Sequence, residues 1–403
     1  MASTSPDRSD SQPTKLSYVG LFLRFLRFGA MAFGGPVAQI AMIRRELVDE
    51  ERWVSSDRFN KLLAVMQVLP GPEAHELCVH LGIRAKGRIG GLLAGLGFML
   101  PGFILMLALA WLYTRLPIQG TILGAVFLGV QAAVLAIILR AVHRIGEHIL
   151  LDRWLWATAA AATTASLVGV SFWIVLPTAG AAYALLARKS YLLDSLLVVA
   201  AAVVATFMLM RSGVGPETLR VTREAAPTAG MLFWAGLKGG LLTFGGAYTA
   251  IPFIRNDTVG RGWMSDGQFL DGLGLSGILP APLVIFSTFV GWICGGPAGA
   301  LAITAGMFLP AFAFSLIFYE RLEAVAEHER LHTFLAGVAA GVIGLIAVTL
   351  LDLGRTTAER TPNLLVGTAI FALVLVILYS WKSKLATPLV LAIGGLAGAV
   401  LLA

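Results

Sequence analysis

The chain has 403 residues, of which 57% are hydrophobic and only 13% are charged, and its mean hydropathy is +0.82. Such a chain has too few polar side chains to cover a soluble surface, so the composition excludes a soluble globular protein and predicts a polytopic membrane protein. The formal net charge is +7, but the cations gather in short loops between apolar runs. That pattern is typical of anchoring at the cytoplasmic face of a lipid bilayer, and we expect no nucleic-acid partner.

The apolar runs lack alternating polar positions, and backbone groups in lipid must be satisfied internally, so an all-α fold is expected and a barrel is not. Residues 1–15 are polar and rich in Ser, Asp and Pro. They contain no apolar core before a cleavage site, and we predict a disordered cytoplasmic N-terminal tail and no signal peptide. Cys78 and Cys294, the two cysteines, both lie in apolar context and indicate neither a disulfide framework nor a metal site.

The sequence contains an internal duplication. Three blocks of the first half return in the same order in the second half, at spacings of 211, 210 and 209 residues, and such periodicity indicates a duplicated fold unit. The matched blocks are Phe33-Gly34-Gly35 with Phe244-Gly245-Gly246, Pro70-Gly71-Pro72 with Pro280-Ala281-Pro282, and Leu100-Pro101 with Leu309-Pro310. We therefore predict two homologous repeats, 16–190 and 228–403, separated by an extra helix and linker at 191–227.

In chain order, the first apolar segment runs from Leu16 to Phe33 and stops at a Gly-Gly-Pro break. Pro36 fits the first turn of a second helix that is too short to span a membrane. The charged stretch Arg44–Lys61 is predicted to be an interfacial loop. Two short helical pieces, Arg58–Leu69 and Glu73–Arg84, then meet at a Pro-Gly-Pro hinge, and they form either one broken crossing helix or a re-entrant hairpin.

Charge asymmetry predicts how the repeats are oriented. The loop Arg84–Arg88 is basic, whereas its counterpart Cys294–Pro297 carries no charge, so the two loops are expected on opposite faces. A further basic stretch, Arg140–Arg153, is placed in a cytoplasmic loop, and one extra helix, Leu192–Met210, reverses the second repeat. The prediction is two inverted-topology repeats with broken or re-entrant helices and roughly 10 to 13 membrane segments, an arrangement typical of secondary transporters.

In such folds the substrate lies near the midplane, where broken helices of the two repeats meet. Free N–H groups at helix N-termini carry partial positive charge and bind oxyanions, so the breaks are candidate sites. The alternative is that these Gly and Pro residues only pack helices or kink them. The candidate substrate-binding residues are Arg27, Phe33, Gly34, Gly35, Pro70, Gly71, Pro72, Lys238, Thr243, Phe244, Gly245, Gly246, Tyr248, Pro280 and Pro282.

Cations inside apolar segments are costly and are functional candidates. Arg27 and Lys238 occupy equivalent positions of the two repeats, and a pair of cations from opposite faces can alternate in compensating a dianion. Arg44 and Arg255 are a second equivalent pair. For Arg24 and Arg27 the alternative is snorkelling to the interface.

Glu73 directly follows the first hinge. It either complements the helix dipole or carries protons, since a buried carboxyl group can titrate near neutral pH. His75 on the same short helix is the second proton-coupling candidate. Glu76 and His80 share a face, but there is no H-E-x-x-H spacing and no third ligand, so no metal is predicted. No Walker motif, dinucleotide fingerprint or nucleophile elbow appears in a suitable context, and we expect neither a cofactor nor an enzyme.

The combination of these motifs resembles the two-domain chromate ion transporter family. The residues that carry the resemblance are Phe33–Pro36, Pro70–Ala74, Leu100–Phe103, Leu242–Tyr248 and Pro280–Val284, and it extends from about Leu16 to Ala403. The resemblance implies membrane transport of chromate, generally as export that confers resistance, with sulfate as the chemically similar oxyanion and with proton coupling. Ala281, where the first repeat has Gly71, is a departure that leaves the two hinges unequal.

The resulting expectation is a proton-coupled chromate antiporter of the inner membrane with a cytoplasmic N-terminus. A carrier of sulfate or another oxyanion is the alternative within the same class, and a channel-like or scaffolding membrane protein without coupled transport is the alternative from another class. The expected partners are chromate or sulfate, protons and lipid, and the sequence leaves a homodimer open.

Overall fold

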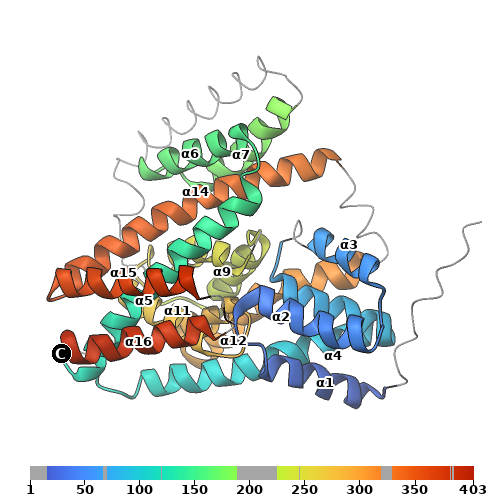
Figure 1. Ribbon diagram of the computed structural model, residues 1–403, viewed down its shortest axis with the longest axis horizontal. Helices are drawn as coiled ribbons and strands as arrows, with labels where there is room; N and C mark the ends of the chain where they lie inside the picture. The colour runs from blue at the N-terminus through green and yellow to red at the C-terminus, as the bar shows by residue number, and fades with distance from the viewer. Residues whose placement is uncertain are drawn as a thin grey trace, which may run out of the picture.

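The structure is a computed structural model that describes residues 16–66, 70–118, 120–187, 225–244, 246–318, 329–381, 383 and 385–403. Within these ranges the chain is helical and contains no strand, which confirms the all-α prediction (Figure 1). The predicted N-terminal tail, the extra helix Leu192–Met210 and Gly245 lie outside the described residues.

The elements follow one another in the same order in both halves. The first half contains α1 (Tyr18–Ala30), α2 (Gly35–Arg44), the π-helical turn η1 (Arg45–Glu50), α3 (Ser56–Met66), α4 (Glu73–Tyr113), α5 (Ile122–Ile149), α6 (Arg153–Leu167) and α7 (Phe172–Ala187). The second half contains α9 (Ala229–Leu241), the 3₁₀ turn η3 (Ala247–Ala250), α10 (Ile251–Thr258), α11 (Asp266–Ile278), the 3₁₀ turn η4 (Leu283–Ile285), α12 (Phe286–Phe318), α14 (Glu329–Arg360), α15 (Leu364–Ser380) and α16 (Ala386–Leu401).

Two segments predicted as loops are helical. Most of Arg44–Lys61 belongs to η1 and α3, because Trp53 between them is fully buried and fixes the stretch against the core of the first repeat. The basic stretch after Arg140 continues α5 as far as Ile149, where His143 and Glu147 form an i,i+4 ion pair at 3.7 Å. Both stretches were predicted as loops because they are charged. Their residue types are compatible with a helix, and packing against the rest of the protein makes them helical.

Helices α4 and α12 each fold back on themselves at a matching kink. Lys86 and Gly87 have φ/ψ values of −146°/28° and 65°/−165°, and the equivalent Gly295 and Gly296 have −148°/20° and 61°/−154°. The positive φ requires glycine at the second position of each kink. A Cβ placed on Gly82 would lie 2.5 Å from the Gly90 carbonyl oxygen, so the two arms of α4 pack backbone to backbone as an antiparallel pair.

Four helices in the described part of the chain are long and apolar enough to cross a membrane. They are Glu73–Tyr113, Ile122–Ile149, Leu283–Ile317 and Leu331–Arg360. The first and third of these contain the kinks just described, so their second arms are the parts long enough to span about 30 Å of hydrocarbon. The structure thus has the long apolar helices of an integral membrane protein.

Glycine contacts at helix crossings repeat in the two halves. A Cβ on Gly29 of α1 would lie 2.3 Å from the Phe98 carbonyl oxygen of α4, and a Cβ on Gly240 of α9 would lie 2.4 Å from the Met307 carbonyl oxygen of α12. These positions are equivalent in the duplicated sequence. Small residues let membrane helices approach closely where no hydrophobic force drives association. The glycines that repeat in the sequence therefore make the same helix–helix backbone contacts in both halves.

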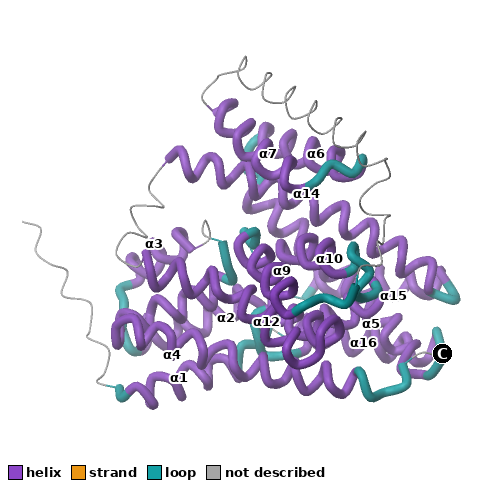
Figure 2. Tube along the Cα trace, turned by 180° about the vertical axis from the view of Figure 1, so that it is seen from behind, coloured by secondary structure: helices purple, strands orange, loops and turns teal. Residues whose placement is uncertain are grey.

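The last helices of each half pack on the long helix of the other half. Helices α6 and α7 lie along α14, and α15 and α16 lie beside α5 (Figures 1 and 2). The closest points are again glycines, since a Cβ on Gly129 of α5 would lie 2.0 Å from the Gly394 carbonyl oxygen and one on Gly337 of α14 would lie 2.6 Å from the Ala179 carbonyl oxygen. One large hydrophobic core contains residues of both halves, so the repeats are interleaved.

Candidate functional site

The Pro-Gly-Pro hinge of the first half lies against the second half. The Gly71 backbone N–H donates to the Thr243 carbonyl oxygen at 2.9 Å, at the end of α9. A Cβ on Gly71, whose φ is +148°, would lie 3.3 Å from the Ala311 Cβ of α12. Pro70, Gly71 and Pro72 are all buried. This hinge is thus held by a backbone hydrogen bond to the helix break of the opposite repeat.

The hinge of the second half is held in the same way, but through a side chain. The buried Gln39 amide of α2 donates to the Ala32 carbonyl oxygen at 2.9 Å and to the Ala281 carbonyl oxygen at 3.0 Å. A Cβ on Gly102 of α4 would lie 2.3 Å from the Ala281 Cβ, and Gly102 is the residue equivalent to Ala311. Pro280 and Pro282 are buried beside it. The sequence therefore predicted both hinges, but not Gln39.

The predicted helix breaks lie where the sequence placed them. Helix α1 ends at Ala30 and α2 begins at Gly35, with Gly34 at φ 90° and Gly35 at φ 76°. In the second half α9 ends at Leu241, Gly246 has φ 133°, and Phe244 is buried. Glycine permits these positive φ values, so the breaks need the residue type that the repeat supplies.

The two equivalent cations are both ion-paired. Lys238 Nζ donates to Asp257 Oδ1 at 2.7 Å, and Arg27 is paired with Glu46. Glu46 and Asp257 occupy equivalent positions, although sequence reasoning singled out neither of them. The spacing of 211 residues that aligned Arg27 with Lys238 also aligns these two acids, and that signal was sufficient to find them.

The two pairs differ in burial. The Lys238 and Asp257 side chains are 9% and 6% exposed, whereas the Arg27 side chain is 54% exposed. Lys238 and Asp257 also line a cavity of about 350 Å³ together with Trp234 and Trp263. Of the two predicted cations, Lys238 is therefore the interior one, and Arg27 has the exposure of a side chain at a surface.

The other charged candidates also have acidic or polar neighbours. Arg24 is paired with Glu51, and Arg44 Nη1 donates to Asn60 Oδ1 at 3.1 Å. Arg24 lies in a partly buried pair, whereas the Arg44 side chain is 40% exposed.

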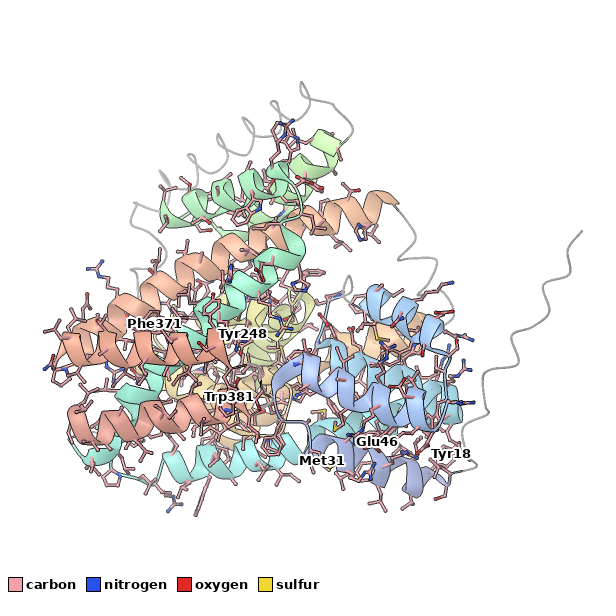
Figure 3. All side chains as sticks on the ribbon, viewed as in Figure 1. Tyr18, Met31, Glu46, Tyr248, Phe371 and Trp381 are labelled. Atoms are coloured by element: carbon pink, nitrogen blue, oxygen red, sulfur yellow. The ribbon has the colours of Figure 1, made fainter. Side chains whose placement is uncertain are left out.

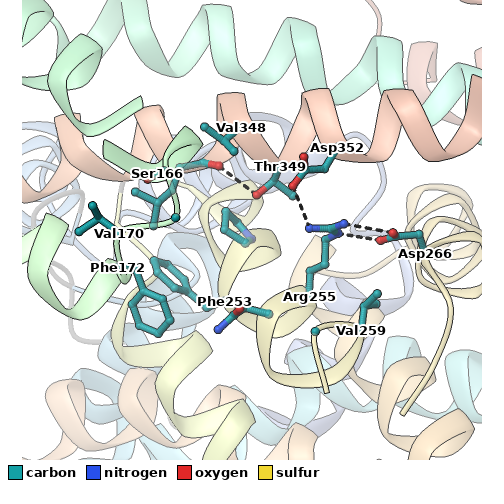
Figure 4. A pocket seen from close by; sticks show the side chains of 15 residues that line it. Ser166, Val170, Phe172, Phe253, Arg255, Val259, Asp266, Val348, Thr349 and Asp352 are labelled. Carbon is teal, nitrogen blue, oxygen red and sulfur yellow. Dashed lines mark hydrogen bonds and ion pairs between the residues drawn. The ribbon is translucent and has the colours of Figure 1, made fainter. Parts of the chain in front are cut away.

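Arg255 joins three helices at a second cavity. Its Nε donates to Asp266 Oδ1 at 2.7 Å, and its Nη1 donates to Asp352 Oδ2 at 3.3 Å. Asp266 begins α11 and Asp352 lies in α14, so the guanidinium of α10 links all three (Figure 4). The cavity beside it has a volume of about 100 Å³ and is also lined by Ser166 and Thr349. Two carboxylates around one guanidinium leave this cluster without net positive charge, so it is poorly suited to an anion.

The first turns of α4 contain three titratable side chains at the boundary between the repeats. Glu73 begins the helix and lies near His148 of α5. The buried His75 ring packs edge to face on Phe312 of α12, with 4.6 Å between the ring centroids. Glu76 is fully buried, and neither of its carboxylate oxygens accepts a hydrogen bond from a described residue. Burial of a carboxyl group without a hydrogen-bond partner costs free energy, so such a group is a functional candidate. Glu76 was not among the proton carriers predicted from the sequence.

Thr243 and Tyr248 flank the second break differently. The Thr243 hydroxyl donates to the Gly239 carbonyl oxygen of α9 at 2.6 Å, as membrane threonines often do, and is thereby occupied by the backbone of the preceding helix. Tyr248, on η3, lies beside α5 near the centre of the molecule (Figure 3). Among the described residues, no group of three or more His, Cys, Asp or Glu side chains is arranged to hold a metal ion.

The profile of the chromate transporter family matches residues 19–219 and 230–399, which are the two halves of the chain. The chain is 63% identical over 390 residues to the chromate transport protein of Pseudomonas aeruginosa, covering 97% of this chain and 94% of that protein. It is 30% identical to the probable chromate transport protein of Synechococcus elongatus, covering 93% of both chains. It is also 30% identical to the chromate transport protein of Cupriavidus metallidurans, over 94% and 92% of the two chains. No solved structure matches the chain.

Proposed function

Because the chain belongs to the chromate transporter family, we propose that this integral membrane protein moves chromate across the inner membrane by secondary active transport. The transport is export coupled to proton movement in the opposite direction, so the protein confers chromate resistance. The observation that carries this proposal is that the hinge of each half is hydrogen-bonded to the opposite half. The Gly71 N–H donates to the Thr243 carbonyl oxygen, and the Gln39 amide donates to the Ala281 carbonyl oxygen. Buried, broken backbone shared by two repeats is the usual setting of a transporter site.

The two repeats are proposed to have inverted topology. This follows from the basic Arg84–Arg88 kink and the uncharged Cys294–Pro297 kink, which have matching backbone geometry but differ in charge, together with the rule that short basic loops face the cytoplasm. The N-terminus is then cytoplasmic. The helix breaks of the two halves would approach the substrate from opposite sides, as alternating access requires.

The proposed substrate site comprises both hinges and both breaks, with Lys238 as its interior cation. Phe33, Gly34, Gly35, Gly246 and Tyr248 contribute from the breaks. For the protons we propose Glu73 and His75, and we add Glu76, whose buried carboxyl lies so close to Gly71 that a Cβ there would be 2.4 Å from Oε1. Movement of the first hinge would therefore change the surroundings of this carboxyl group.

Chromate and sulfate are both tetrahedral dianions, so transport measurements with each anion are needed to tell which one is the substrate. Purified protein in proteoliposomes is expected to transport chromate saturably, with stimulation by an imposed pH gradient and weaker inhibition by sulfate. Sulfate transport without chromate transport would support the sulfate carrier instead. Chromate flux that neither saturates nor responds to the pH gradient would indicate a channel.

Glu73→Gln is expected to abolish stimulation of chromate flux by the pH gradient while chromate exchange across the membrane persists, because the amide cannot carry a proton. Glu73 makes no hydrogen bond to another described residue, so the substitution breaks no hydrogen bond among them. The measurement is the initial chromate flux at several pH gradients. Glu359→Gln on the exposed surface of α14 is the control. An unchanged response in Glu73→Gln would leave Glu73 as a helix-dipole cap.

A further inference from the structure

A dianion that enters the membrane region needs positive charge that is not already neutralised. The interior cation Lys238 is bound to Asp257, and Arg255 is bound to two aspartates. These side chains can attract an anion only after their own carboxylates are displaced. The structure therefore raises the question of which cations are available to the substrate.

Helix α5 contains such cations on one face. Arg140, Arg144 and His148 follow one another at intervals of four residues, which places them in a row along the helix. Arg140 is half-buried, whereas Arg144 and His148 are exposed. Neither Arg140 nor Arg144 forms an ion pair with any residue that the structure describes. We call these three side chains the α5 basic row. His143 and Glu147, by contrast, pair with each other on an adjoining face.

The α5 basic row lies on the helix that packs against the second break, since α5 contacts η3. Ile145, one turn beyond Arg140, approaches Gly246, where an added Cβ would lie 3.8 Å from the Ile145 Cδ1. Arg140 is close enough to the Tyr248 hydroxyl for their charges to interact, and His148 stands in the same relation to Glu73. The row thus leads from the exposed end of α5 to the break at Gly246. Tyr248 makes no hydrogen bond to another described side chain, so its hydroxyl is free to donate.

We propose that Arg140 binds the transported tetrahedral oxyanion directly, with the Tyr248 hydroxyl as a second donor, and that Arg144 and His148 draw the anion toward it. This assignment rests on the proposed transport function and names a residue for it. A guanidinium presents several N–H donors in a planar fork that matches the edge of an oxyanion. Two guanidinium groups on one face of a helix raise the local concentration of a dianion beside it. Arg140 therefore receives the substrate before Lys238 is released from Asp257.

The test compares Arg140→Gln and Arg140→Lys with wild-type protein. Equilibrium binding of chromate to the purified full-length protein is measured by titration calorimetry, and chromate flux is measured in proteoliposomes. Loss of a charge-assisted pair is expected to weaken chromate binding in Arg140→Gln by about 10- to 100-fold, with a matching rise in KM. Arg140→Lys retains the charge but not the fork and is expected to lie between the two. Arg355→Gln is the matched control, since Arg355 is exposed and paired with Glu359 on α14.

The outcomes separate this inference from the transport function. If Arg140→Gln binds chromate as tightly as wild type and elutes normally in size exclusion, the assignment of Arg140 is wrong, whereas chromate transport by the wild type still stands. If the wild type binds chromate but does not transport it, the transport function fails, and the binding series still decides the role of Arg140. Absence of chromate binding by the wild type overturns both.

Discussion

Lys238→Ala is expected to destabilise the protein by about 3–5 kcal/mol, the usual cost of leaving one partner of a buried ion pair without the other. Asp257 is 4% exposed as a residue, and Lys238 Nζ is its nearest cationic partner at 2.7 Å. Arg261, whose Nη2 lies 3.9 Å from Asp257 Oδ1, is too distant to replace it fully. The measurement is the thermal unfolding midpoint of the detergent-solubilised protein, monitored by size exclusion after heating.

Two further variants separate the structural role of Lys238 from a role in transport. Lys238→Met combined with Asp257→Leu removes both charges and is expected to restore most of the stability, since apolar replacement of a whole buried pair is often neutral. If Lys238 also binds the substrate, this stable double variant does not transport chromate. Normal flux in the double variant would show that Lys238 is only structural.

The equivalent position of the first repeat supplies a matched comparison. Arg27→Ala breaks the pair with Glu46, whose side chain is 12% exposed, but the Arg27 side chain is 54% exposed, so water can enter where the guanidinium stood. A smaller loss of stability than in Lys238→Ala is therefore expected there. Equal losses in Arg27→Ala and Lys238→Ala would contradict the difference in burial.

Gly240→Ala is expected to lower the stability by about 1–3 kcal/mol or more, the range for forcing extra atoms into a packed interface. The added Cβ would lie 2.4 Å from the Met307 carbonyl oxygen and 3.1 Å from the Pro310 ring, and neither a backbone carbonyl nor a rigid proline ring can move away as a flexible side chain would. Helices α9 and α12 would have to separate. The measurement is again the unfolding midpoint, together with the yield of monodisperse protein from the membrane.

Gly354→Ala in α14 is the control, because nothing lies within 4 Å of a Cβ at that position. Alanine favours helix over glycine by about 0.8–1.0 kcal/mol, so this variant is expected to be neutral or slightly more stable. The same chemical change therefore has opposite expected signs at the two positions. A stabilising effect at Gly240 would mean that the close crossing of α9 and α12 is wrong.

Much of the architecture was predictable because the duplication aligns residues that need special backbone. The positive φ at Gly34, Gly35 and Gly246 and the matching kinks of α4 and α12 occur where glycine or proline repeats at constant spacing. A positive φ value is a property of a single residue, so the presence of glycine at a position indicates it directly. The boundaries of the repeats, the inverted orientation and the substrate-binding roles remain predictions.

What could not be predicted depends on which distant segments pack together. Nothing in the order of elements indicates that α6 and α7 pack on α14 while α15 and α16 pack on α5. For the same reason the stretch after Arg140 was interpreted as a cytoplasmic loop, although it forms the end of α5 beside the second helix break. Gln39 is a polar residue in an unremarkable position of the sequence, and its role follows only from the Ala281 carbonyl that it reaches across 242 positions.

The reciprocal hinge contacts make the two repeats a single cooperative unit. Displacement of the first hinge breaks the hydrogen bond from Gly71 to Thr243, and displacement of the second breaks the one from Gln39 to Ala281. Each of these bonds ends on backbone of the other half, and the long helix of each half is covered by helices of its partner. A state with one hinge moved and the other unmoved therefore loses contacts between the two halves. We expect such intermediates to be sparsely populated, so the protein switches between two whole-molecule states in which both repeats change together.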